Sequence, residues 1–131
     1  MLDTHCLVWM DQAVERMGAS ARQLADEAIA MSRLAVSAIS FWEVALLVRK
    51  GRLRLEQSLG VWRRDLLGRG VIELPLGGAT CIAAAQLGYF HADPADRFIV
   101  ATARELGATL LTADDKILAW SGRLDRRDAR V

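Results

Sequence analysis

Four acidic residues lie in four separate segments of the 131-residue chain: Asp3, Glu43, Asp96 and Asp114. Hydrolysis of a phosphodiester requires an activated water, stabilised charge on the phosphate and a stabilised leaving oxygen, and divalent cations held by carboxylates serve all three needs. Mg²⁺ and Mn²⁺ prefer hard oxygen ligands, so three or four carboxylates from separate segments suit either ion. The four acids therefore form a candidate catalytic and metal-ligating set.

Each of these acids also has a purely structural interpretation. Asp3 and Asp114 can cap helices that begin directly after them. Ser40 and Glu43 have the spacing of a capping box, and Asp96 stands where a helix dipole favours an acid. No single acid decides between the two interpretations, but the joint arrangement of all four favours a metal site.

The apolar pattern predicts alternating strands and helices. Short apolar runs bounded by turn residues indicate strands at 34–39, 71–74 and 109–112. Helices are expected at 20–31 after a capping box of Ser20 and Gln23, then through Glu43 to Gly51, then at 59–70, 78–88, 94–106 and around 117–120. The dipeptide Asp93-Pro94 is the clearest helix start, because Asp is a favoured N-cap and Pro fits the first helical position.

Strands separated by helices indicate an α/β fold with a parallel sheet covered on both faces. In such sheets ligands bind outside the carboxyl ends of the strands. Asp3 follows the only residues that could belong to a first strand, and Asp96 opens a helix. Glu43 and Asp114 each follow a predicted strand. One end of the sheet is therefore expected to gather the acids.

The overall composition fits a single folded domain over residues 1–131, with 53% hydrophobic residues. Seventeen Lys and Arg against sixteen Asp and Glu give a net charge of +1, which by itself implies no polyanion partner. Cys6 and Cys81 have no paired-ligand spacing, so we expect both to be buried and reduced, with neither zinc nor disulfide. The chain shows no leader segment and no apolar run of membrane-spanning length, and we expect a cytoplasmic protein without membrane contact.

Four short segments together resemble the PIN-domain ribonucleases, and among them the VapC-type toxins of type II toxin–antitoxin pairs. The segments are LDTH at 2–5, SAISFWE at 37–43, DPADR at 93–97 and LTAD at 111–114. Each segment alone is a weak signal, whereas the four in this order are specific. The resemblance spans nearly the whole chain.

This resemblance implies a fold, an activity and partners. The fold is a three-layer sandwich in which a central parallel sheet of four or five strands carries helices on both faces. The activity is that of a Mg²⁺- or Mn²⁺-dependent endoribonuclease, a toxin that inhibits translation and growth. The implied partners are an RNA substrate, a cognate antitoxin and a second copy of the chain in a homodimer.

The resemblance maps the acidic residues of the family onto the same four acids. It also implies supporting roles for Thr4, Asp93 and Thr112. Arg97 adjoins the third acid in sequence and is expected either to contact the substrate phosphate or to form a surface ion pair. Only Met1 and Leu2 precede Asp3, so the first strand is expected to be short, or the true start to lie upstream.

Two other functions use the same residues differently. In a phosphate-responsive signalling domain, Asp3 or Asp114 would accept a phosphoryl group beside Thr112 and Lys116, but the acids are scattered rather than paired at one strand. In a non-enzymatic interaction module, the acids would be helix caps and the four tryptophans would fill the core or a partner surface.

Overall fold

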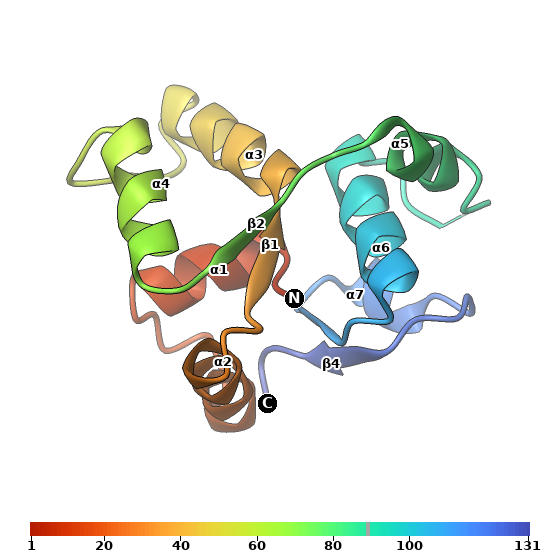
Figure 1. The fold of residues 1–131 in the computed structure, drawn as a ribbon, viewed down its shortest axis with the longest axis horizontal. Helices are drawn as coiled ribbons and strands as arrows, with labels where there is room; N and C mark the ends of the chain where they lie inside the picture. The colour runs from red at the N-terminus through yellow and green to blue at the C-terminus, as the bar shows by residue number, and fades with distance from the viewer. Residues whose placement is uncertain (89) are drawn as a thin grey trace.

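A computed structural model describes residues 1–88 and 90–131 of the chain (Figure 1). Within these residues it contains seven helices and four short strands. In chain order they are α1 (Thr4–Asp11), α2 (Ala19–Ala30), β1 (Ala35–Ser37), α3 (Ala38–Arg49), α4 (Leu59–Gly68), β2 (Ile72–Leu74), α5 (Gly78–Ala85), α6 (Pro94–Leu106), β3 (Leu110–Thr112), α7 (Asp115–Ala119) and β4 (Arg126–Asp128).

The strands form a parallel sheet that is joined at its centre by a single residue. β1 pairs with β2 and β3 pairs with β4, both in parallel. Leu2 bridges the two pairs, because it contacts Val36 of β1 and Leu111 of β3 as a parallel neighbour of each. The Leu2 amide donates to Ala35 at 3.0 Å, and the Leu111 amide donates to Met1 at 2.9 Å. The expected parallel sheet is confirmed, and its first strand is shortened to this one bridge.

Helices cover both faces of the sheet. Consecutive strand residues point to opposite faces, and accordingly Met1 and Leu110 join one apolar cluster while Leu2 and Leu111 join the other. The first cluster is completed by residues of α6 and α7, and the second by residues of α1 to α4. Figure 1 shows α1 to α4 on one side of the molecule and α5 to α7 on the other. This arrangement is the expected three-layer α/β sandwich.

The start of α3 differs from the prediction. A strand was expected over 34–39, but β1 ends at Ser37 and α3 begins at the next residue. The Ser37 hydroxyl accepts a hydrogen bond from the Ile39 amide at 3.2 Å and thereby caps the helix. The interpretation of Ser40 and Glu43 as a capping box is therefore wrong, because Ser37 caps the helix. The side chains of Ser40 and Glu43 make other contacts instead.

Two other local predictions are also wrong. The expected capping box at Ser20 is absent, since α2 begins at Ala19 behind Gly18, and Gly18 has no side chain with which to cap. The alanine-rich helix ends at Ala85, before the expected Gly88.

Helix α6 follows the prediction closely. Asp93 caps it by accepting a hydrogen bond from the Ala95 amide at 3.0 Å, and Pro94 occupies the first helical position. Gly107 ends the helix in the left-handed conformation with φ of 59°. Within the described residues no helix is long and apolar enough to cross a bilayer.

The buried face of α6 should contribute strongly to stability. Ile99 of α6 is fully buried, whereas Ile82 of α5 is 60% exposed. We expect Ile99→Ala to lower the free energy of unfolding by about 2–5 kcal/mol, because it leaves a cavity. The matched surface variant Ile82→Ala should change it by no more than about 0.5 kcal/mol. Urea unfolding of both variants measures the difference, and equal losses would contradict this account of the core.

Candidate active site

Asp3 is fixed between the central bridge of the sheet and helix α1. Its Oδ1 accepts a hydrogen bond from the Cys6 amide at 2.8 Å, so the side chain caps α1. Its Oδ2 accepts from the Thr112 hydroxyl at 2.5 Å. The residue is only 3% exposed. The short first strand thus holds this carboxylate firmly, because the helix and β3 both bind it.

Thr112 connects Asp3 to Asp114. The Thr112 Oγ1 that donates to Asp3 also accepts a hydrogen bond from the Asp114 amide at 3.1 Å. Asp114 in turn caps α7, with its Oδ1 accepting from the Lys116 and Ile117 amides at 2.8 and 3.0 Å. Its Oδ2 is left to face the site.

Glu43 is held by the residue that follows Asp3. The Thr4 hydroxyl lies within hydrogen-bond distance of Glu43 Oε1, and 3.0 Å from Ser40 Oγ. Burial raises the pKa of the Glu43 carboxyl, and the charges of Asp93 and Asp3 add to this effect, while the bond to Thr4 opposes it. Thr4 therefore links the start of α1 to α3 and positions a carboxyl with increased proton affinity.

His91 bridges two of the predicted acids. Its Nε2 lies 3.0 Å from Asp114 Oδ2 and 3.2 Å from Asp96 Oδ2. Its Nδ1 accepts a hydrogen bond from the Asp93 amide at 3.0 Å, which assigns the proton to Nε2 in the neutral ring. The imidazole thus lies between the Asp96 and Asp114 carboxylates and donates its N–H toward both.

The environment of Asp96 disfavours its charged form. Burial is the main cause that raises the pKa of this carboxyl from 3.8 to about 7; the charges of Asp93, Glu43 and Asp114 contribute in the same direction, and His91 opposes the shift. Partial burial also works to raise the pKa of Asp114, but bonds from His91 and the α7 amides outweigh it, so the pKa of Asp114 is lowered. Two neighbouring carboxyls are therefore shifted in opposite directions, as at many functional sites.

The four predicted acids belong to one connected site, but they are not equally close. The nearest group consists of Asp96, Asp114 and His91, whose ligand atoms lie within 4.8 Å of one another. Among the described residues, Asp3 and Glu43 lie outside that closest group, and they connect to the site through Thr112 and Thr4.

Three residues depart from what the sequence indicated. No role was predicted for His91, although its place two residues before the Asp93 cap puts it beside the acid-bearing turn. Arg97 directs its guanidinium at the backbone carbonyls of Ala84, Ala85, Gly88 and His91, at 3.0 to 3.3 Å, and so secures the end of α5. Cys6 is buried as expected, but Cys81 is exposed, because it lies on the outer face of α5.

The chemistry of this donor set fits a divalent cation. Asp96 and Asp114 bring hard oxygens together, and burial, with the charges of neighbouring carboxylates, raises the pKa of Asp96. His91 presents an N–H rather than a lone pair in this orientation, so it suits a partner of the carboxylates better than a ligand. The residues that would hold Mg²⁺ or Mn²⁺ are therefore Asp96 and Asp114, with Asp3 and Glu43 nearby.

The chain is similar to known proteins over most of its length. The family model described as PIN domain matches residues 1–120 of the chain. The chain is also 35% identical over 119 residues to Ribonuclease VapC22 of Mycobacterium tuberculosis (strain ATCC 25618 / H37Rv), an alignment that covers 89% of this chain and 88% of that protein.

The shifted pKa of Asp96 predicts a pH-dependent cost to the metal-free fold. Between pH 3.8 and about 7 the folded chain holds a proton on Asp96 that the unfolded chain releases, so this residue makes stability fall as pH rises through that range. Asp96→Asn removes this contribution. In chelator at pH 7 to 8 the variant should be more stable than the wild type by roughly 0.5–2 kcal/mol, and this advantage should shrink as the pH falls toward 4.

Denaturant unfolding at several pH values measures this advantage. Asp26→Asn is a suitable control, because Asp26 is exposed on α2, away from the site. An advantage of Asp96→Asn that does not vary between pH 4 and 8 would show that the carboxyl carries no folding-linked proton.

Proposed function

The chain belongs to the PIN domain family, and from that premise we propose that it is a VapC-type endoribonuclease that hydrolyses RNA with Mg²⁺ or Mn²⁺. The observation that carries the proposal is the convergence of Asp96 and Asp114 around His91, in a site where burial and neighbouring charge raise the pKa of Asp96 to about 7. Such uncompensated carboxylates suit a divalent cation and, through it, a phosphodiester.

The side chains of the site have different proposed roles in this reaction. A bound divalent cation supplies Lewis acidity toward the phosphate and the attacking water. Asp96 and Asp114 are the proposed ligands, and Asp3 and Glu43 contribute negative charge from the adjoining walls. Thr4, Thr112 and Asp93 are positioning residues: the two hydroxyls orient Glu43 and Asp3, and Asp93 caps the helix that carries Asp96.

The two alternative functions explain fewer of these observations. Helix capping accounts for Asp3, Asp93 and Asp114, but not for Glu43 and Asp96, which cap no helix and have raised pKa values. A phosphoryl acceptor at Asp3 is disfavoured, because that carboxylate is buried and both of its oxygens accept hydrogen bonds. Nuclease chemistry is therefore the function that uses all four acids.

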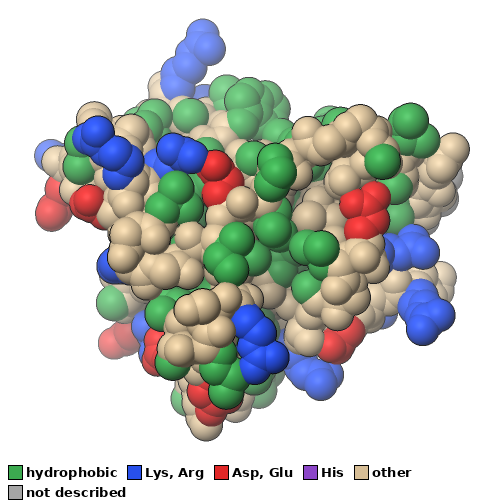
Figure 2. Space-filling model, viewed as in Figure 1, with side chains coloured by type: hydrophobic (Ala, Val, Ile, Leu, Met, Phe, Trp, Pro, Cys, Tyr) green, Lys and Arg blue, Asp and Glu red, His purple; other side chains and the backbone are tan. Residues whose placement is uncertain are grey.

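We further propose that the chain acts in the cytoplasm as the toxin of a toxin–antitoxin pair, inhibiting translation by cutting RNA. Its surface offers an apolar groove for protein partners. In Figure 2 apolar side chains are exposed near the centre of this face, in the region of β1 and β2. The groove is lined by Ala38, Ile39, Trp42, Leu76, Pro94, Ala95 and Phe98, and Trp42 is 54% exposed. Homodimerisation through this groove and binding of a cognate antitoxin complete the proposal.

The first test of the proposed activity is cleavage of RNA by the purified chain. We expect cleavage with Mg²⁺ or Mn²⁺, and none in excess chelator. Asp96→Asn should lower the rate by at least about 100-fold while the chain stays folded, because the amide keeps the size of the side chain but removes an anionic ligand. Asp26→Asn should cleave like the wild type. Undiminished cleavage in chelator, or by Asp96→Asn, would rule out the proposed site.

The second test concerns the apolar groove. Sedimentation at micromolar concentration should show a dimer for the wild type and a monomer for Trp42→Glu, because the variant places a charge in the interface core. Ile82→Glu, which alters an exposed isoleucine outside the groove, should remain dimeric. A strictly monomeric wild type that is unchanged by the antitoxin, or a dimeric Trp42→Glu, would contradict this assignment of the groove.

A further inference from the structure

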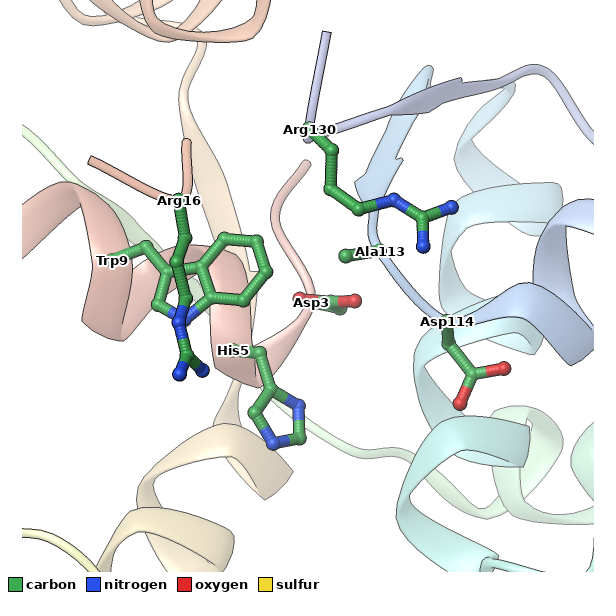
Figure 3. A pocket seen from close by; sticks show the side chains of 7 residues that line it. All are labelled: Asp3, His5, Trp9, Arg16, Ala113, Asp114 and Arg130. Carbon is green, nitrogen blue, oxygen red and sulfur yellow. The ribbon is translucent and has the colours of Figure 1, made fainter. Parts of the chain in front are cut away.

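A pocket of about 410 Å³ opens directly beside the carboxylate site (Figure 3). Its volume lies within the range of about 300–1,000 Å³ that is usual for ligand pockets. We call it the α1 pocket, and it is lined by Asp3, His5, Trp9, Arg16, Ala113, Asp114 and Arg130. Two of the proposed catalytic acids thus form part of its wall, and the remaining residues are mostly aromatic or cationic.

Helix α1 fixes the aromatic side of this pocket relative to Asp3. His5 and Trp9 are four residues apart on α1 and therefore share one face of the helix. Trp9 is partly buried against the core, which holds its ring in place while the ring also lines the pocket. Because Asp3 caps the same helix, the ring and the carboxylate belong to one rigid unit.

Two arginines, Arg16 and Arg130, line the α1 pocket together with the acids. Arg130 is held by Asp115 and Asp128, each at 2.8 Å, so its guanidinium has a fixed place at the pocket edge. Arg16 is exposed and, within the described part of the chain, forms no ion pair. In Figure 3 Arg16 and Trp9 lie on one side of the pocket and Asp114 on the other, with Asp3 between them.

We propose that the α1 pocket binds one nucleotide of single-stranded RNA next to the phosphate that is cut, with its base stacked on Trp9 and its phosphate paired with Arg16. Stacking on an aromatic ring requires an unpaired base, so the pocket favours single strands over duplex. An arginine fork suits a phosphate, and its place beside the acids brings the RNA backbone to them despite their charge. This inference rests on the proposed nuclease function and adds two residues, Trp9 and Arg16, that would hold the nucleotide beside the acids.

The test is binding of a fluorescently labelled single-stranded RNA oligonucleotide in excess chelator, where cleavage does not occur, followed by fluorescence anisotropy. We expect single-stranded RNA to bind more tightly than a duplex of the same sequence. Trp9→Leu should weaken binding by about fivefold or more, the loss of one stacked base, whereas Trp9→Phe should keep most of the affinity. Arg16→Gln should reduce the slope of log affinity against log salt by about 0.7, the value for one phosphate contact on a single strand.

Arg64→Gln is the matched control, because Arg64 is exposed on α4 outside the pocket and should leave both affinity and slope unchanged. Circular dichroism checks that each variant is folded, and the exposed Arg16 provides a test that does not depend on the packing of Trp9.

The possible failures of this inference can be told apart from failure of the nuclease function. If the wild type cleaves RNA with Mn²⁺ but Trp9→Leu and Arg16→Gln bind like the wild type, the α1 pocket is not the subsite and the nuclease function stands. If the wild type neither binds nor cleaves RNA, both are wrong. Tighter binding of an aspartate-rich peptide than of RNA, lost in Arg16→Gln, would assign the pocket to an acidic protein segment and overturn the inference.

Discussion

Leu2 sits between β1 and β3 and, with Met1, exchanges backbone hydrogen bonds with both, so one residue joins the two halves of the sheet. Asp3 follows directly, and the backbone hydrogen bonds of this bridge position it at the carboxyl end of the sheet. From there two threonines extend the site: Thr112 binds Asp3 from β3, and Thr4 reaches Glu43 on α3. The central strand is almost absent as secondary structure, yet the arrangement of the site depends on its bridge.

The site contains two kinds of acidic residue: acids fixed by helix capping, and buried acids without a capping role. Asp3, Asp93 and Asp114 each cap a helix, and capping fixes side chains without requiring a cation. Asp96 and Glu43 have no such role, and burial raises the pKa of both carboxyls. A His91 N–H lies between Asp96 and Asp114 and donates toward both carboxylates. The predicted helix caps are therefore confirmed for Asp3 and Asp114. The metal site stays a proposal, and in it Asp114 would act both as a cap and as a ligand.

The sequence predicted helix α6 and the gathering of the acids at one end of the sheet, because the signals for both are local. An Asp-Pro start, a glycine end and an apolar stripe lie within one segment, and acids that follow strands gather wherever a parallel sheet forms. Strand β4 was missed because its residues, Arg126 to Asp128, are all charged and pair only at the sheet edge. The contact of His91 with Asp114 and the hydrogen bonds of Arg97 to the end of α5 join separate segments, so the local residue pattern did not reveal them. The start of α3 was misplaced because Ala38 and Ile39 fit either a strand or a helix by residue type. The hydrogen bond from the Ile39 amide to the Ser37 hydroxyl shows that the helix has already begun there.

We propose that Asp96 and its neighbours form a divalent cation site, and Mn²⁺-dependent stability tests this claim most directly. A ligand that binds only the folded chain stabilises it by about 2.7 kcal/mol at a hundredfold excess over its dissociation constant. Thermal melting with chelator and with millimolar Mn²⁺ should show a clear gain for the wild type and for Asp26→Asn, and a much smaller gain for Asp96→Asn and Glu43→Gln. An equal Mn²⁺ gain in all four proteins would place the ion elsewhere and contradict the claim.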